Sequence, residues 1–332
     1  MDGTKRVSIV DIAKQAGVST ATVSRVMNQN GGYSKETEKR VRQTIAACDF
    51  TPNVNAIGLR TNKSQCIGVI VPDVTNEFFA KIIQELDFYL LKHGYSLLIC
   101  NSNEDYELEN MHIKGLIEKH VDGIVYISGQ NEIKYINEIK DVPIVYIDRA
   151  PQNAKMLILS DNEGGGYMAT EEMLKKGCSD ILLLRDVRCA STIRSRKEGY
   201  VKALEKYGIP YREELEISCF PDYEDAWKAM KQLIKSRGCF FDGVFATNDR
   251  MALASVNVLE NVGIQIPEQV KVVGFDNVSL TRFTSPRITT VSQDTKQMAI
   301  CAGRTILKMI RKKEIKESCT IIPVTLEVRD TT

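Results

Sequence analysis

Residues 8–28, SIVDIAKQAGVSTATVSRVMN, contain two short amphipathic patterns separated by a glycine. Ser8 stands three residues before Asp11, which is the spacing of a helix cap. Apolar residues then recur on one helical face as far as Gly17, which predicts the end of the helix. After the glycine, apolar residues again recur at three- and four-residue spacing. Two short helices joined by a glycine-containing turn predict a helix-turn-helix.

A third amphipathic stretch, SKETEKRVRQTIAACDF at residues 34–50, would close a small three-helix core. In a helix-turn-helix the second helix lies in the major groove of DNA, with its exposed N-terminal residues against the base edges. Arg25 can form a bidentate pair with guanine and the Ala21 methyl can pack on a thymine methyl, although Ser and Thr at such positions are also typical of helix caps. The candidate contacts from this helix are Thr20, Ala21, Thr22, Ser24 and Arg25.

The distribution of charge sets this segment apart from the rest of the chain. The chain has 44 basic and 43 acidic side chains, a net charge of +1. Residues 1–63 hold ten basic and five acidic side chains, so the net charge is +5 there and −4 in the remainder. Such an asymmetry indicates that the N-terminal end binds a polyanion.

Length and composition exclude several classes of protein. The 332 residues, 43% of them hydrophobic, predict two or three globular domains. No apolar run approaches the ~18 to 20 residues that span a bilayer, and the start MDGTKRVSIV lacks the apolar core of an export signal, so we expect a cytoplasmic protein. The nine cysteines include no CxxC pair and the three histidines lack metal-ligand spacing. We therefore expect reduced thiols, no metal and no cofactor.

The segment at residues 8–28, with FTPNVNAIGLRTNKS at residues 50–64, closely resembles the DNA-binding headpiece and hinge of the LacI/GalR family of bacterial transcription regulators. The resemblance implies an all-α headpiece over residues 1–50 and a hinge over residues 51–63. In the family this hinge folds into a helix only on DNA, and a leucine, here Leu59, wedges into the minor groove and kinks the duplex. The further DNA contacts that the resemblance implies are Ser8, Ser19, Asn28, Asn53, Ala56 and Leu59.

From Cys66 onward, short apolar runs alternate with helical patterns in two successive series. Strands that read as continuous Ile, Val and Leu runs between helices indicate parallel sheets covered on both faces. Two such series predict an α/β body of two doubly wound parallel-sheet lobes. This body resembles the regulatory domain of the same family, which is similar to periplasmic binding proteins for sugars. The resemblance implies a first lobe of residues 64–162 and 293–322 and a second lobe of residues 163–292 and 323–332.

Polar residues gather directly after several of the predicted strands, where ligands of open α/β sheets bind. Asn76 follows IGVIVPD and Asp276 follows KVVGF, although each of these residues is equally suited to cap a helix. The pattern resembles that of ribose-binding members of the family. Where the family usually has proline this chain has Glu77, which we expect to loosen the loop without removing a ligand contact. The implied effector contacts are Asn76, Phe78, Phe79, Asp148, Arg149, Arg196, Tyr223, Asn248, Asp276 and Gln293.

These residue types suit a neutral sugar, because hydroxyl groups both donate to carboxylates and accept from guanidinium groups. We therefore predict a repressor of carbohydrate-utilisation genes, not an enzyme, that binds double-stranded operator DNA as a homodimer on a pseudo-palindromic site, at the bacterial nucleoid. A ribose-like pentose or a hexose between the lobes would change its affinity for the operator. The identity of the sugar, including phosphorylated ones, and the sign of the response stay open. So do a tetramer and a phosphoprotein co-regulator, which some members of the family use.

Two other functions are alternatives to this prediction. The sequence GGGYMA at residues 164–169 fits the GxGxxA motif of an NAD(P)-dependent oxidoreductase, with Asp186 about 20 residues further on. The motif does not open the first series, and a simple turn from a strand into a helix explains it equally. An exported sugar-binding protein would have the same cleft, but it would lack the headpiece.

Overall fold

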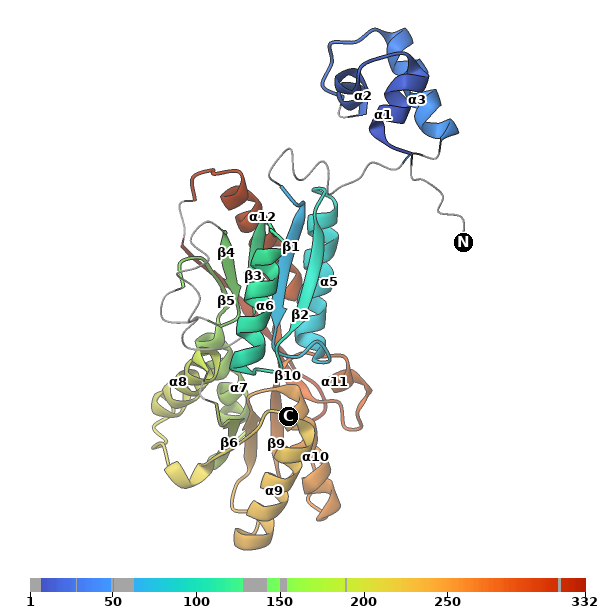
Figure 1. The fold of residues 1–332 in the computed structure, drawn as a ribbon. Coiled ribbons are helices and arrows are strands. Elements are labelled where there is room, and N and C mark those ends of the chain that lie inside the picture. Colours follow the sequence, from blue (N-terminus) through green and yellow to red (C-terminus); the bar gives the residue numbers. More distant parts are fainter. Residues whose placement is uncertain are drawn as a thin grey trace. The chain divides into compact units, whose positions relative to one another are not determined.

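The computed structural model describes residues 7–27, 29–48, 50, 63–127, 142–149, 154–188, 190–315 and 318–332. The chain divides into two compact units, Met1–Ser64 and Gln65–Thr332, which we call the headpiece and the body (Figure 1). Over the described ranges, no helix has both the length and the apolar composition that a membrane crossing requires. The same residues contain no group of three or more His, Cys, Asp or Glu side chains placed to hold a metal ion.

The headpiece contains the predicted helix-turn-helix. Helix α1 (Ile9–Ala16) begins after Ser8, whose hydroxyl oxygen accepts a hydrogen bond from the Asp11 amide at 3.3 Å, while Asp11 Oδ2 accepts one from the Ser8 amide at 2.9 Å. It ends at Gly17, whose φ of 64° is left-handed and therefore favours glycine. Helices α2 (Thr20–Met27) and α3 (Lys35–Ala47) follow. The three helices enclose a core of Ile12, Ala13, Ala16, Val23, Val26 and Val41.

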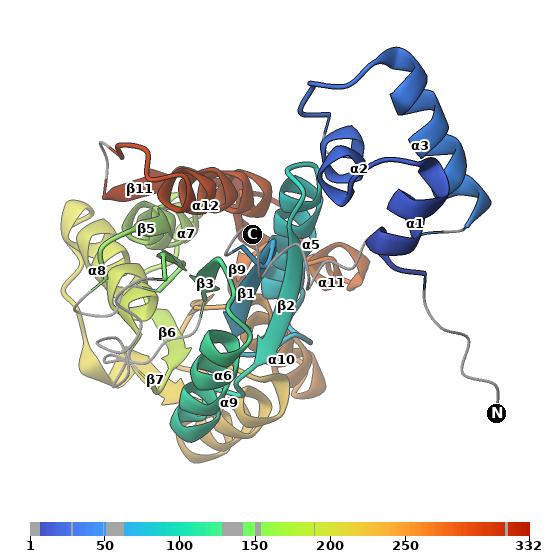
Figure 2. The ribbon, with the colours of Figure 1, turned by 45° about the horizontal axis from the view of Figure 1, so that its top comes forward.

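The first lobe of the body is a parallel sheet with helices on both faces. Its strand order among the described residues is β11-β5-β4-β3-β1-β2. Side chains alternate between the two faces, so Val69 packs with α5 and α12 whereas Ile70 packs with α6. Figure 2 shows α6 on the opposite side of this sheet from α5 and α12. Its elements are β1 (Cys66–Val71), α5 (Glu77–Leu91), β2 (Ser96–Asn101), α6 (Tyr106–Glu118), β3 (Gly123–Tyr126), β4 (Ile144–Ile147), β5 (Leu157–Ser160), α12 (Thr295–Ile310) and β11 (Cys319–Ile322).

The second lobe repeats this architecture with the strand order β12-β10-β9-β8-β6-β7 among the described residues. Its strands run parallel except β12, which pairs antiparallel with β10. Helices α7 and α8 cover one face of the sheet, and α9 and α10 cover the other. Its elements are α7 (Asn162–Lys175), β6 (Ile181–Asp186), α8 (Ser191–Lys206), the 3-10 turn Glu213–Leu215, β7 (Glu216–Cys219), α9 (Tyr223–Arg237), β8 (Gly243–Ala246), α10 (Asp249–Asn261), β9 (Lys271–Asp276), α11 (Leu280–Phe283), β10 (Thr289–Gln293) and β12 (Val324–Glu327).

The chain passes between the lobes from β5 to α7, from β10 to α12 and from β11 to β12. These crossings lie side by side, because Ile322 pairs with Ser160 in the first sheet and Val324 pairs with Gln293 in the second. Gln293, which we expected to begin the return to the first lobe, is the last residue of β10 in the second. A few short connections at one place allow the two lobes to rotate relative to each other.

Candidate ligand cleft and nucleic-acid interface

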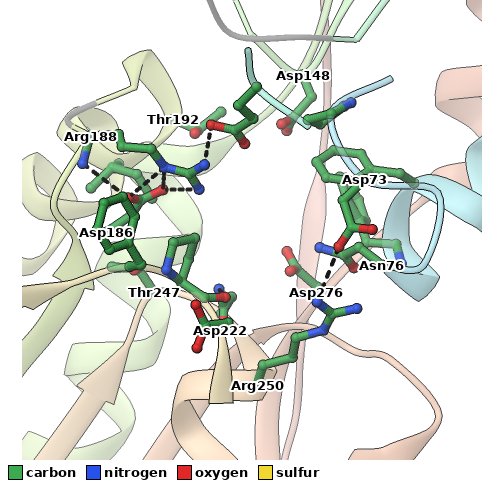
Figure 3. Close-up of a pocket in the computed structure, with 18 of the residues that line it drawn as sticks. Asp73, Asn76, Asp148, Asp186, Arg188, Thr192, Asp222, Thr247, Arg250 and Asp276 are labelled. Carbon is green, nitrogen blue, oxygen red and sulfur yellow. Dashed lines mark hydrogen bonds and ion pairs between the residues drawn. The ribbon is translucent and has the colours of Figure 1, made fainter. Parts of the chain in front are cut away.

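A cleft of about 270 Å³ lies between the two lobes of the body, beyond the carboxyl ends of their strands (Figure 3). Small-molecule sites usually measure roughly 300–1,000 Å³, so this cleft suits a small ligand. Both lobes contribute to its lining, so a ligand in it would touch both. Eight of the ten predicted effector contacts line it: Asn76, Phe78, Phe79, Asp148, Arg149, Arg196, Asn248 and Asp276.

Arg196, on α8, is a buried cation of this cleft. Its Nε donates a hydrogen bond to Asn162 Oδ1 at 2.8 Å, and its Nη1 donates to the carbonyl oxygen of Thr247 at 2.5 Å. The guanidinium carbon lies 3.6 Å from the centroid of the Phe275 ring, a cation–π contact. Burial lowers the pKa of Arg196, yet a guanidinium stays charged at neutral pH. Its remaining Nη2 lies 3.7 Å from Asp276 Oδ1, so the group is held with one edge toward the cleft.

Two buried carboxylates face this cation. Burial raises the pKa of Asp148, and the charges of Arg196 and Arg149 oppose part of that rise. Burial also raises the pKa of Asp276 to about 7; Arg196 opposes the rise and the Asp148 carboxylate adds to it. Asp148 and Asp276 have φ angles of 68° and 109°, which are uncommon for residues with a side chain. Strain of this kind is typical of functional sites.

Two buried polar atoms on residues that line the cleft lack hydrogen-bond partners among the residues that the structure describes. Within the described part of the chain, four buried side-chain polar atoms have no hydrogen-bond partner: Asp148 Oδ1, Arg149 Nε, Gln293 Oε1 and the Tyr146 hydroxyl. The first three belong to the predicted effector set. Of these residues, Asp148 and Arg149 line the cleft and Gln293 does not. Leaving such an atom unsatisfied costs about 1–3 kcal/mol, so one acceptor and one donor on adjacent lining residues indicate that a ligand completes them.

Two predicted contacts do not line the cleft. Gln293 lies behind it and donates a hydrogen bond from Nε2 to Asp276 Oδ1 at 2.7 Å, so it orients that carboxylate. Tyr223 is the first residue of α9, and its hydroxyl accepts a hydrogen bond from Asn257 Nδ2 at 2.9 Å. Phe220, which follows β7, supplies the aromatic side chain that we had expected from Tyr223.

The cleft is lined by more charged side chains than the predicted effector contacts include. Arg250 Nη1 lies 3.2 Å from Asp73 Oδ2 and so joins the second lobe to the first. Figure 3 shows this pair and Arg188 at opposite sides of the cleft. Most of these residues also follow strand ends, so the same rule could have found them. The full charged lining is Asp73, Glu104, Asp148, Asp186, Asp222, Asp276, Arg149, Arg188, Arg196 and Arg250, six carboxylates against four guanidinium groups.

The structure corrects the expectation that Glu77 loosens the loop in which it stands. Its carboxylate accepts hydrogen bonds from the Ser279 amide at 2.8 and 2.9 Å and from the Ser279 hydroxyl at 2.5 Å, and it pairs with Lys81 at 2.6 Å. Ser279 belongs to the second lobe, whereas Glu77 begins α5 of the first. Glu77 therefore does not loosen its loop but ties it across to the other lobe.

The glycines at residues 164–166 lie inside α7, in close contact with neighbouring elements. A Cβ atom on Gly165 would collide with the Phe275 ring, and one on Gly166 would collide with the backbone of Arg196. These glycines therefore permit close packing of α7 against α8 and the sheet.

The headpiece presents part of the predicted DNA-binding set. Thr20, Ala21 and Arg25 are exposed on α2 and Thr22 is partly exposed, while Ser19 caps the helix through a 3.2 Å hydrogen bond from the Thr22 amide to Ser19 Oγ. Ser8 is exposed as the cap of α1. Ser24 corrects one expectation, because it is only 9% exposed and so does not face outward. Asn28, Asn53, Ala56 and Leu59 lie outside the described residues.

Comparison with known proteins separates the same two parts of the chain. A family model for bacterial regulatory proteins of the lacI family matches residues 8–53, and one for the periplasmic binding protein-like domain matches residues 170–332. The HTH-type transcriptional repressor PurR of Pasteurella multocida is 32% identical over 310 residues, 92% of each chain. The ribose operon repressor of Halalkalibacterium halodurans is 31% identical over 325 residues, 98% of this chain and 97% of the relative.

Solved structures show the same fold. A lac repressor dimer bound to operator and the anti-inducer ONPF superimposes with a TM-score of 0.89 at 23% identity, covering 98% of this chain and 99% of that one. A LacI family transcriptional regulator from Enterococcus faecium with bound ribose gives a TM-score of 0.72 at 26% identity, covering 80% of this chain and 98% of that one. The headpiece matches the family model, and relatives more than 30% identical align over nearly their whole length. With the two-lobed body, these matches show that this chain belongs to the lacI family of bacterial regulatory proteins.

Proposed function

We propose that this protein is a sequence-specific DNA-binding repressor of carbohydrate-utilisation genes, and that a small neutral sugar in the cleft changes its affinity for operator DNA. The sugar is a ribose-like pentose or a hexose. One observation carries the proposal. At the cleft, the acceptor Asp148 Oδ1 and the donor Arg149 Nε are buried without hydrogen-bond partners among the described residues, and they stand beside the Asp276 carboxylate and the buried Arg196 guanidinium group.

A sugar hydroxyl can complete both kinds of atom, because it donates one hydrogen bond and accepts others. The carboxylates of Asp148 and Asp276 accept, and the fixed edge of Arg196 donates. Phe78 and Phe79 are buried at the cleft with ring centroids 5.2 Å apart, and their apolar faces suit the C–H groups of a sugar ring. Few ligand classes match this mixture of apolar walls and both hydrogen-bonding polarities.

The balance of charge favours a neutral ligand over an anion. The lining holds six carboxylates and four guanidinium groups. An anionic effector would add a further negative charge to a lining that is already negative, and the repulsion is strong where water is excluded. A polyhydroxylated neutral ligand pays no such cost.

The names of relatives and neighbours support a sugar. One relative is a ribose operon repressor, and a structural neighbour holds ribose. Relatives named PurR are as similar in sequence, so purines belong in any ligand screen. Because these relatives are named as repressors and the glycines of α7 serve packing, we propose no enzymatic activity for this chain.

Binding to an operator fits a homodimer. One headpiece covers one half-site, and a two-fold axis supplies the second. Exposed apolar side chains on α5, the edge strand β2 and α6 of the first lobe support pairing of two bodies. They are Phe88, Leu91, Ile99 and Met111. Two hinges, each over residues 51–63, would then meet at the operator centre with their Ala56 and Leu59 side chains. The dimer would act in the bacterial cytoplasm, and a tetramer or a phosphoprotein co-regulator stays a prediction of the family resemblance.

Ligand and operator are coupled through the arrangement of the lobes. A ligand that contacts both lobes favours one angle about the three crossings, which moves the two hinges of the dimer relative to each other. Inducers and corepressors use the same two arrangements with opposite preferences. The sign of the response is therefore a question for experiment.

A thermal-shift screen tests the effector. We expect D-ribose or another neutral monosaccharide to raise the melting temperature, with about 2.7 kcal/mol of added stability at 100 times the dissociation constant. D-ribose 5-phosphate, purines and NAD belong in the same screen. Stabilisation by a purine or by NAD with no response to any neutral sugar would contradict the proposal.

A further inference from the structure

Two arginines from different lobes converge on one carboxylate in the cleft. Arg149 Nη2 donates a hydrogen bond to Glu104 Oε1 at 3.0 Å, and Arg188 Nη1 pairs with Glu104 Oε2. Arg149 follows β4 of the first lobe, whereas Arg188 follows β6 of the second. All three residues line the cleft, and the Glu104 side chain is only 19% exposed. Each oxygen of this carboxylate thus pairs with an arginine from a different lobe.

Each arginine also pairs with a second carboxylate, Asp186 for Arg188 and Asp148 for Arg149. Asp186 accepts from Arg188 Nε at 3.0 and 3.1 Å and from Arg188 Nη2 at 2.8 Å, an arrangement visible in Figure 3. Asp148 Oδ2 lies 4.0 Å from Arg149 Nε. Removing the charge of Glu104 would therefore leave two oriented guanidinium groups whose outer nitrogens point at one place.

The loop that carries Glu104 adopts an unfavourable backbone conformation. Asn103 and Glu104 have φ angles of 50° and 58°, two consecutive left-handed residues that are not glycine. The loop is fixed by hydrogen bonds from Asn101 Nδ2 to Asn103 Oδ1 at 2.6 Å and from the Glu104 amide to Ser102 Oγ at 3.4 Å. Strain of this kind persists where it positions a functional side chain. Here it presents the Glu104 carboxylate to both arginines.

We propose that Glu104 is a specificity residue of the effector site, which occupies the place where an anionic group of a ligand would bind and so makes the cleft reject phosphorylated sugars. The inference rests on the proposed function, because it concerns the same cleft. A guanidinium fork binds carboxylate and phosphate oxygens alike, so a phosphate would have to displace Glu104. Even with Glu104 displaced, Asp148 and Asp186 still balance the charges of the two arginines, so a phosphate dianion would find no excess of positive charge there.

The test compares the full-length wild-type protein with Glu104→Gln, which keeps the size of the side chain and removes its charge. Calorimetric titrations use D-ribose, D-ribose 5-phosphate and inorganic phosphate. We expect the wild type to bind D-ribose at least ~10-fold more tightly than the phosphate ester, and Glu104→Gln to shift this ratio at least ~10-fold toward the ester, the scale of one hydrogen bond to a charged group. Inorganic phosphate should bind Glu104→Gln at least ~10-fold more tightly than it binds the wild type.

Two further variants separate this effect from a general loss of negative charge. Adding Arg188→Gln to Glu104→Gln should remove the gain in phosphate affinity. Glu171→Gln is the matched control, since Glu171 is also shared by two cations, Lys175 at 2.8 Å and Lys206 at 2.9 Å, on α7 and α8 outside the cleft lining. It should leave all three affinities unchanged. If Glu104→Gln unfolds, Glu104→Gly serves instead, because glycine tolerates the φ of 58°.

The outcomes are distinguishable from failure of the proposed function. Unchanged ligand ratios in the folded Glu104 variants, a wild type that binds the phosphate ester as tightly as D-ribose, or an equal gain in Glu171→Gln would each overturn the inference. If no sugar binds any variant but inorganic phosphate binds Glu104→Gln more tightly, the exclusion of anions stands and the sugar function fails.

Discussion

Replacing Arg196 with alanine removes the cation that stands beside the buried carboxylates of Asp148 and Asp276. Its guanidinium donates hydrogen bonds to Asn162 and to the Thr247 carbonyl, and it packs on the Phe275 ring. Removing one partner of a buried ion pair costs about 3–5 kcal/mol, and we expect a loss of that size in the free energy of unfolding near pH 8. The loss should be smaller near pH 6, because Asp276, whose pKa is already about 7, is then mostly protonated and no longer needs the cation.

The same substitution should weaken sugar binding at least ~100-fold, since each hydrogen bond to a charged group contributes about 1.5–3 kcal/mol. Operator affinity without sugar should stay within about twofold, because the headpiece is a separate unit. Urea unfolding at the two pH values, calorimetry with sugar and fluorescence anisotropy with operator measure these three quantities. Arg194→Ala, which changes an exposed arginine two residues earlier on α8, should alter stability by less than about 0.5 kcal/mol. Normal sugar affinity in Arg196→Ala would refute this account of the cleft.

Four other outcomes follow from the same reasoning. Leu59→Ala should reduce bending of the operator and affinity for it while sparing sugar binding, and unchanged bending in a gel-mobility assay would rule out the wedge. Operator affinity should fall steeply with salt because residues 1–63 carry a net charge of +5, whereas a nearly flat double-logarithmic plot would argue against the electrostatic contribution. Sugar affinity should fall roughly tenfold from alkaline pH to about pH 6, because a donating hydroxyl favours the ionised form of Asp276, and calorimetry across the pH range would show this. Burial raises the pKa of Asp276 from 3.8 in the unfolded chain to about 7 in the folded, ligand-free protein. Between pH 4 and pH 7 the folded protein therefore keeps a proton on Asp276 that the unfolded chain has lost. The contribution of this group to the free energy of unfolding should accordingly rise as the pH falls from 7 toward 4.

Much of the fold could be predicted from local pattern. The cap at Ser8 and the stop at Gly17 act within one turn of helix, so a short window of sequence contains them, and both are confirmed. Continuous apolar strands separated by helices likewise predict parallel sheets, and both lobes have them. The strand Thr289–Gln293 could not be predicted from its sequence, because its polar Thr, Ser and Gln residues lack the continuous apolar pattern of the other strands. The run TIIPVTLEV reads as one strand, but Pro323 divides it between two sheets.

The candidate site could be predicted where it follows strand ends and not where it depends on side-chain direction. Asn76, Asp148 and Asp276 lie at or shortly after the carboxyl ends of strands, and the structure brings them together. Whether Phe220 or Tyr223 faces the cleft depends on a few residues between β7 and α9, which no periodic pattern reports. The link between Glu104 and Arg188 joins two lobes and requires a left-handed loop, so it is visible only in three dimensions.

The burial of Ser24 has a similar cause. Helices α1, α2 and α3 pack around one core, so which side of α2 stays exposed depends on both of its neighbours. Contacts that depend on a third element are therefore the ones that reasoning from a single helix misses.

The central claim is that a ligand in the cleft changes the affinity for DNA. The most direct test measures the dissociation constant of the full-length protein for an operator that the protein selects from random duplexes, with and without a saturating neutral sugar from the thermal-shift screen. The account predicts a change of roughly 5- to 150-fold, a coupling of about 1–3 kcal/mol, that disappears in Arg196→Ala. A sugar that binds the cleft at saturation and leaves the operator dissociation constant unchanged would contradict it.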